Sequence, residues 1–160
     1  MTRCNAMVDT SIRLHSFCYT HLPLSHIESI DLGNNEFTGS IPAEVGQWNR
    51  LEYLSVNNNN LQGQIPMNIG MLTSLKTLKV NSNMLTGVVP ASISNMINLK
   101  SLQLYENDLS GVFPESVLQL QNLGKDSKAN ICVFLSFYQK RCNSNTLLHS
   151  MKSVTQKFYL

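Results

Sequence analysis

The chain has few charged and few aromatic residues. Of its 160 residues, 14% are Asp, Glu, Lys or Arg and 8% are aromatic, and the formal net charge is +2. A balance this close to neutral gives no indication that the chain as a whole binds nucleic acid or a membrane surface. Apolar runs are short as well: Ile131–Tyr138 is far below the roughly 20 residues of a membrane-spanning helix. We therefore expect no nucleic-acid partner and no direct membrane insertion.

Motifs that carry catalysis are also missing. No glycine-rich loop and no V-A-I-K, H-R-D or D-F-G motif occurs, which excludes a kinase domain from this sequence. The four histidines show neither metal-ligand nor triad spacing; they are His15, His21, His26 and His149. We expect a protein that is not an enzyme and that needs no metal and no cofactor.

The sequence does contain a period of 24 residues. Asparagine recurs at Asn35, Asn59, Asn83 and Asn107. Glycine follows at Gly39, Gly63, Gly87 and Gly111, and proline at Pro42, Pro66, Pro90 and Pro114. A fixed period of this length is typical of a solenoid, and four units exceed the minimum of about three that a stable stack needs. The predicted units begin at Ile27, Leu51, Leu75 and Leu99.

Each unit begins with the pattern of a half-buried strand. In the second unit, Leu54 and Val56 alternate with the polar or amphipathic Tyr53 and Ser55. Asn59 follows where the chain turns out of this strand. Its amide can satisfy main-chain groups that the turn would otherwise bury unpaired. We expect the four equivalent asparagines to form a ladder through the stack: Asn35, Asn59, Asn83 and Asn107.

The second half of the unit returns the chain to the next strand. We expect Gly63 at a tight bend and Pro66 to stop regular strand pairing. A short helical or 3-10 turn then closes the unit. The remaining residues of the core are expected to be Leu61, Ile65, Ile69 and Leu72.

The segment LQGQIP at 61–66, with variants at 37–42, 85–90 and 109–114, identifies a family. It resembles the plant-specific class of leucine-rich repeats. That class occurs in the ectodomains of receptor-like kinases and receptor-like proteins, and in polygalacturonase-inhibiting proteins. The resemblance implies an α/β solenoid, with a curved parallel β-sheet on the concave face and short helical or 3-10 turns on the convex face.

The strand residues that alternate with the core form what we call the concave face. In related receptors this face engages peptides or partner proteins, so the resemblance implies a peptide or protein ligand, including a co-receptor ectodomain. Tyrosine gives a large contact area at low entropic cost, which makes Tyr53 and Tyr105 the expected anchors. The predicted face comprises Ser29, Asp31, Tyr53, Ser55, Asn57, Thr77, Lys79, Asn81, Ser101, Gln103 and Tyr105.

Three alternatives to a receptor-like binding module stay open. The concave face can be a plain solvated sheet. The chain can be an inhibitor of a secreted hydrolase, as the polygalacturonase-inhibiting proteins are. It can also be a truncated product without a function of its own.

Two segments without the period flank the repeats. The predicted organisation is a non-repeat segment 1–26, a leucine-rich-repeat domain 27–123, and a segment 124–160 that is either disordered or a partial cap. The last segment is basic, with six Lys or Arg against one Asp or Glu. Family members normally begin with a secretion signal and a cysteine-containing cap, whereas Met1–Arg13 has no signal-like apolar run. We therefore expect the chain to be a fragment of a longer receptor-like sequence.

The compartment stays open for the same reasons. The resemblance implies an extracellular or cell-surface location, yet none of the eighteen asparagines lies in an N-x-S/T sequon. All four cysteines lie in the flanks, at spacings that fit no zinc or redox motif. Cap disulfides Cys4–Cys18 and Cys132–Cys142 and free thiols are both compatible with the sequence.

Overall fold

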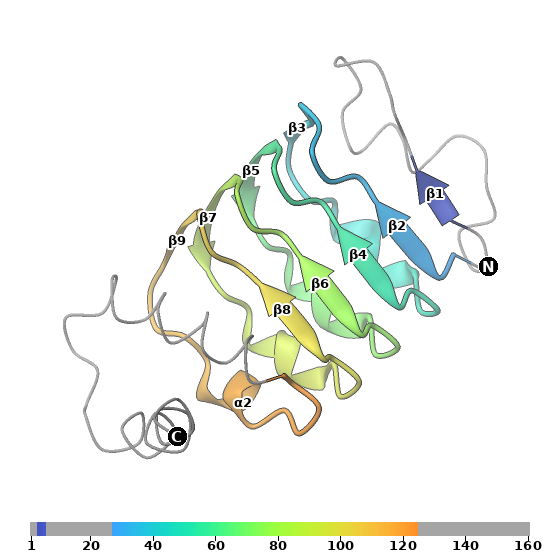
Figure 1. The fold of residues 1–160 in the computed structure, drawn as a ribbon. Helices are drawn as coiled ribbons and strands as arrows, with labels where there is room; N and C mark the ends of the chain where they lie inside the picture. Colours follow the sequence, from blue (N-terminus) through green and yellow to red (C-terminus); the bar gives the residue numbers. More distant parts are fainter. Residues whose placement is uncertain (1–2, 6–26, 125–160) are drawn as a thin grey trace, which may run out of the picture.

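A computed structural model describes residues 3–5 and 27–124 (Figure 1). In the second of these ranges the chain winds through four successive coils, each with a strand in one sheet, a strand in a second sheet and a short helix. The first sheet contains, in order, β1 (Arg3–Asn5), β2 (Ser29–Asp31), β4 (Tyr53–Ser55), β6 (Thr77–Lys79) and β8 (Ser101–Gln103). The second sheet contains β3 (Thr38–Gly39), β5 (Asn60–Gln64), β7 (Met84–Val88) and β9 (Asp108–Ser110). The coils close through η2 (Ala43–Gln47), η3 (Met67–Met71), η4 (Ala91–Asn95) and α2 (Glu115–Leu118).

The first sheet is parallel, and its register follows the sequence period. Tyr53 of β4 lies opposite Thr77 of β6, 24 residues later, and the other repeat strands pair with the same offset. β1 is different because Arg3 lies opposite Ser29, an offset of 26 residues. A strand from the segment that we expected to be free of the repeat therefore extends the sheet beyond β2.

The second sheet corrects our expectation for the segment after the ladder asparagine. We expected Gly63 at a tight bend, but it lies inside β5, which pairs with β7. Gly63 has a φ of 76°. This left-handed conformation is unfavourable for residues that have a Cβ atom, but glycine adopts it with little strain. The unusual torsion is accommodated within a paired strand, so parallel pairing continues on both sides of the glycine. Pro66 then marks the point where pairing ends, because it is the N-cap residue of η3.

Short 3-10 turns close the first three coils, as expected. In the second coil, Ile69 N–H donates to the Pro66 carbonyl at 3.0 Å and Leu72 N–H donates to the Ile69 carbonyl at 3.1 Å. Gly70 allows neighbouring turns to approach, because a Cβ there would lie 2.7 Å from the Ser92 carbonyl carbon. The fourth coil has the α-helical turn α2 instead.

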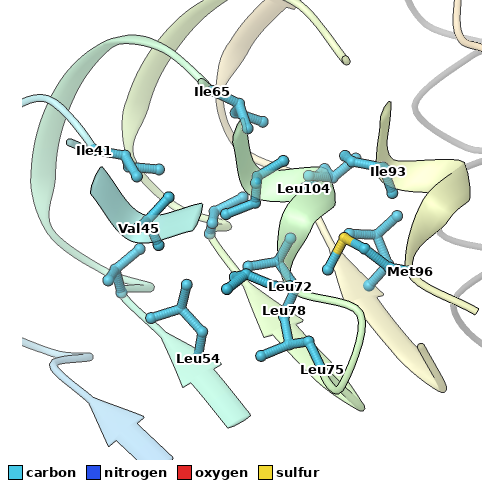
Figure 2. Close-up of a cluster of buried hydrophobic side chains, with 14 of the residues drawn as sticks. Ile41, Val45, Leu54, Ile65, Leu72, Leu75, Leu78, Ile93, Met96 and Leu104 are labelled. Atoms are coloured by element: carbon cyan, nitrogen blue, oxygen red, sulfur yellow. The ribbon is translucent and has the colours of Figure 1, made fainter. Parts of the chain in front are cut away.

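The core lies between the first sheet and these turns (Figure 2). Leu54 and Leu78 project from β4 and β6 toward Val45, Leu72 and Met96 of the turns. All five side chains are buried, with at most 3% of their surface exposed. No coil could bury these side chains alone, so each repeat completes the core of its neighbours.

The core leaves little internal space. A cavity between the first two coils has a volume of about 10 Å³, and its lining is apolar, including Ile30, Trp48 and Leu54. A volume of this size holds at most about one water molecule, and an apolar lining offers that water no partner. This cavity is too small to hold a ligand.

Candidate functional site

The first sheet brings the residues predicted for the concave face together on one side. Its parallel register places equivalent residues of successive repeats next to one another. Ser55 and Asn81, however, are only 1% and 4% exposed, so they offer a ligand almost no surface. The other nine predicted residues are half-buried or exposed: Ser29, Asp31, Tyr53, Asn57, Thr77, Lys79, Ser101, Gln103 and Tyr105.

Tyr53 lies between two opposite charges on this face. Its hydroxyl donates to Asp31 Oδ2 at 3.5 Å, and the Nζ of Lys79 lies 5.7 Å from the centroid of its ring. The hydrogen bond is at the long limit for such a contact, and an exposed cation–π contact contributes only about 0.5–1 kcal/mol. Neither contact is strong enough to withhold the carboxylate or the ammonium group from a ligand.

Ser55 is hidden because it supports a neighbouring side chain. Its hydroxyl donates to Asn57 Oδ1 at 2.5 Å. Asn57 in turn lies over Gly33, where a Cβ would be 2.6 Å from Asn57 Oδ1. Asn57 can occupy this space because Gly33 has no side chain, and the Ser55 hydroxyl holds Asn57 there.

Asn81 is the first residue in a chain of hydrogen bonds that leads through Ser82 to Glu106 at the rim of the face. Its Nδ2 donates to Ser82 Oγ at 3.1 Å, and the Ser82 hydroxyl donates to Glu106 Oε2 at 2.6 Å. Because a hydroxyl has one proton and the carboxylate accepts it, Asn81 must present its amide N–H₂ to Ser82. This orientation leaves Asn81 Oδ1 buried, and within the described residues that atom has no hydrogen-bond partner.

A row of left-handed residues forms this rim where each coil leaves the first sheet. The φ angles of Asn34, Asn58, Ser82 and Glu106 lie between 52° and 57°. This conformation is unfavourable for most L residues, and asparagine tolerates it best. Neighbouring members of the row are linked, since Asn58 Nδ2 donates to Asn34 Oδ1 at 2.7 Å.

Three of the four predicted ladder asparagines, Asn59, Asn83 and Asn107, hold these turns in place. The described side-chain hydrogen bonds of Asn35 go to the Leu32 and Gly33 carbonyls of its own coil, at 3.2 and 3.0 Å. Asn59 Oδ1 accepts the Phe37 N–H of the preceding coil at 2.9 Å. Its Nδ2 donates to the Leu32 carbonyl of the preceding coil at 2.8 Å and to the Val56 carbonyl of its own coil at 3.1 Å. Asn83 and Asn107 repeat this arrangement one and two coils later. Each of these amides therefore joins two coils through main-chain groups.

A column of charges at the strand starts was missed by our sequence analysis. Main-chain hydrogen bonds stack Glu28, Glu52, Lys76 and Lys100, the second residue of each repeat, one above the next. Their side chains are exposed, and Lys76 Nζ forms an ion pair with Glu52 Oε2 at 2.7 Å. The 24-residue spacing of these four residues is a signal in the sequence that could have predicted this column.

The described residues contain no group of three or more His, Cys, Asp or Glu side chains that could hold a metal ion. In the same part of the chain, no helix has the length and apolar character needed to cross a membrane. Cys18, Cys132 and Cys142 lie outside the described residues, as does nearly all of segment 124–160. Our predictions for these cysteines and for that segment stay predictions.

Comparison with known families agrees with this geometry. One family model described as leucine-rich repeat matches residues 73–125, and a second matches residues 26–48 and 50–72. Together the two models match every coil of the solenoid. The chain belongs to the leucine-rich-repeat family. No curated protein gives a significant match to this sequence.

Solved structures similar to this chain include plant receptor ectodomains and a plant ice-binding protein. The plant peptide hormone receptor RGFR1, in complex with RGF2, is 43% identical with a TM-score of 0.59, over 60% of this chain and 15% of the receptor. The BIR3–SERK2 complex from Arabidopsis thaliana gives 35% identity and a TM-score of 0.57, over 62% of this chain and 52% of that one. The ectodomain of the receptor kinase SOBIR1 from Arabidopsis thaliana gives 32% identity and a TM-score of 0.59, over 62% of this chain and 53% of that one. The chain thus spans about half or less of each of these relatives.

Proposed function

We propose that the chain is a non-catalytic binding module that holds a peptide or protein segment on its concave face. By similarity to the receptors above, this binding serves signal perception, with a peptide or a co-receptor ectodomain as the partner. The observation that carries the proposal is the arrangement around Tyr53. An aromatic ring, a carboxylate and an ammonium group lie together on a face that the core does not constrain.

The rest of the face supports a binding role. Nine of the predicted side chains are accessible, and they differ in chemistry from repeat to repeat, whereas the core positions keep similar apolar side chains. Tyr105, which is 37% exposed, provides a second aromatic contact on the strand side of the rim. Aromatic side chains dominate the affinity of many protein interfaces, so Tyr53 and Tyr105 are the proposed anchors.

The size of the face limits the ligand. Four repeat strands about 4.8 Å apart span roughly 15 Å from β2 to β8. A standard interface uses about 20–30 residues from each partner, well above the nine accessible residues of this face. The described solenoid therefore holds only a few residues of an extended segment, or binds weakly.

A random library of linear dodecapeptides displayed on phage tests the proposal with the full chain as bait. We expect enriched peptides whose affinity for the chain falls at least about tenfold when Tyr53→Ala and Tyr105→Ala are combined. Val112→Ala, at a side chain that is 79% exposed and lies beyond the end of β9, is the matched control and should leave the affinity unchanged.

Two results would overturn the proposal. One is a library that yields no peptide with saturable binding. The other is enriched peptides that bind the double tyrosine variant as tightly as the original chain, while circular dichroism shows the variant to be folded. In the second case the binding surface lies elsewhere on the molecule.

A further inference from the structure

At the strand starts and strand ends of the first sheet, acidic side chains in the first two repeats give way to lysines in the last two, although Arg50 precedes β4 and Arg3 of β1 pairs with Ser29. Glu28, Asp31 and Glu52 belong to the first two repeats, whereas Lys76, Lys79 and Lys100 belong to the last two. Two separate columns show the same order. The column at the strand starts runs Glu28, Glu52, Lys76, Lys100, and the sheet register aligns Asp31, Ser55 and Lys79.

The two halves meet at a boundary where the charges neutralise each other. The Lys76–Glu52 ion pair at 2.7 Å joins the third repeat to the second. On the acidic side of this boundary, neither Glu28 nor Asp31 forms a salt bridge with a described residue. On the basic side, neither Lys79 nor Lys100 does. Outside this ion pair, the carboxylates Glu28 and Asp31 lie in the first repeat, and the ammonium groups of Lys79 and Lys100 lie in the third and fourth. Asp31 also accepts the Gly33 N–H at 3.1 Å and the Tyr53 hydroxyl at 3.5 Å.

The opposite rim does not cancel this pattern. Its charged member is Glu106 in the fourth repeat, and that carboxylate already accepts the hydroxyl proton of Ser82. Glu106 lies after β8, at the far end of the strands from Lys100. About six residues of chain separate Glu106 from Lys100, or roughly 15–20 Å at strand geometry, which exceeds the Debye length at physiological salt. Glu106 lies nearer to Lys79, because Gln103, the register partner of Lys79, is only three residues before Glu106. Glu106 therefore reduces the positive charge beside Lys79 but does not reach Lys100.

We infer that the face selects an extended peptide segment carrying one basic and one acidic side chain. The basic side chain lies over Glu28 and Asp31, the acidic side chain lies over Lys79 and Lys100, and the chain between them crosses Tyr53. This inference rests on the proposed function and adds the chemistry and the placement of its ligand. Complementary charge of this kind determines which ligands bind and in which orientation.

The sheet geometry sets the separation of the two ligand charges. Asp31 on β2 lies two strand spacings from Lys79 on β6 and three from the column of Lys100, or about 10–14 Å. An extended peptide rises about 3.3 Å per residue, and residues an even number apart point to the same side. A basic and an acidic residue four positions apart, about 13 Å, fit this distance.

The dodecapeptide library, screened on the full chain, provides the test. We expect enriched peptides to carry a basic and an acidic residue about four positions apart more often than the unselected library does. A synthetic peptide of this kind should lose about tenfold in affinity on Lys79→Glu, and the loss should shrink as salt is raised. Asp108→Lys, an exposed charge reversal on the second sheet, is the matched control and should change the affinity little.

Exchanging the charges tests the placement. In the variant that combines Glu28→Lys and Asp31→Lys with Lys79→Glu and Lys100→Glu, we expect the affinity to recover most of the loss. A photo-crosslinker beside the basic residue of the peptide should then label the third and fourth repeats instead of the first and second. Recovery with this change of labelling supports the inference.

Other results separate this inference from the proposed function. Enriched peptides that bind through Tyr53 but show no charge pair, or whose affinity is the same on Lys79→Glu, overturn the inference and leave the proposed function standing. Crosslinks that stay on the first two repeats after the exchange also overturn it. A library without any binding peptide overturns both.

Discussion

Asn83 Oδ1 accepts a hydrogen bond at 3.0 Å from the main-chain N–H of Leu61, a residue of the preceding coil. The same amide donates to the carbonyl of Val56 at 2.9 Å. Val56 lies just after β4 and Leu61 lies in β5, so a single side chain fixes both ends of the turn that joins the two sheets. That turn carries Asn57 and Asn58 on the rim of the concave face. The asparagine that recurs in every repeat thus supports concave-face residues that differ from repeat to repeat.

Replacing Asn83 tests this linkage. Asn83→Ala would leave the Leu61 N–H buried without its partner, whereas the Val56 carbonyl would keep the hydrogen bond from Asn59 Nδ2. We expect the unpaired Leu61 N–H to cost about 1–3 kcal/mol in the free energy of unfolding. Urea unfolding monitored by circular dichroism gives the value.

Asn81 provides a matched control because it is the same residue type and is also buried, at 4% against 9% exposed. Its Oδ1 has no hydrogen-bond partner among the described residues, and its Nδ2 donates only to Ser82 Oγ in that part of the chain. Asn81→Ala therefore removes one hydrogen bond together with an unsatisfied buried oxygen. We expect Asn81→Ala to destabilise clearly less than Asn83→Ala. Equal losses would show that packing, and not hydrogen bonding to the preceding coil, gives the ladder position its value.

The close approach of the convex turns leads to a second prediction. In Gly70→Ala the new methyl group would meet the Ser92 backbone, so η3 and η4 would have to separate. Overpacking of this kind costs about 1–3 kcal/mol. Ser94→Ala creates alanine at the same repeat position one coil later, where the chain already accommodates a side chain. Its expected cost is within about 0.5 kcal/mol, and thermal melts that rank the two variants the other way would contradict this packing.

The ion pair between Glu52 and Lys76 should contribute little to stability. Both side chains are nearly half exposed, at 47% and 46%, and exposed pairs typically contribute about 0.2–1 kcal/mol. A double-mutant cycle with Glu52→Gln and Lys76→Met should give a coupling energy in this range that falls in 1 M salt. A coupling above about 2 kcal/mol, or one that salt leaves unchanged, would show that the charge boundary has a structural role.

Much of the fold could be predicted because the same pattern of apolar residues, asparagine, glycine and proline occurs in four successive units. The alternation of Leu54 and Val56 with polar neighbours predicted the first sheet, and the need to return the chain to the next strand predicted the helical or 3-10 turn that follows Pro66. The second sheet was missed. Its strands alternate weakly, and Gly63 at φ 76° suggests a bend to any reading based on one strand alone. Pairing with the same segment of the next coil stabilises this strand, and that pairing is not visible within a single unit.

The candidate site was predictable in outline but not in detail. Strand periodicity placed Tyr53 and Lys79 on one face, but it could not show that Lys79 lies over the Tyr53 ring. It also assigned Ser55 to the accessible surface. Ser55 is buried because its hydroxyl turns toward Asn57, which occupies the space above Gly33. Side-chain contacts between coils decide such cases.

Covalent footprinting tests most directly whether the concave face is the binding surface. The full chain would be labelled with a photogenerated carbene in the presence and absence of an enriched dodecapeptide. We expect the peptide to protect Tyr53, Lys79 and Tyr105 on the concave face, and to leave the labelling of Gln62 and Thr86 on the second sheet unchanged. Protection of the second sheet, with unchanged labelling of Tyr53 and Tyr105, would contradict the account.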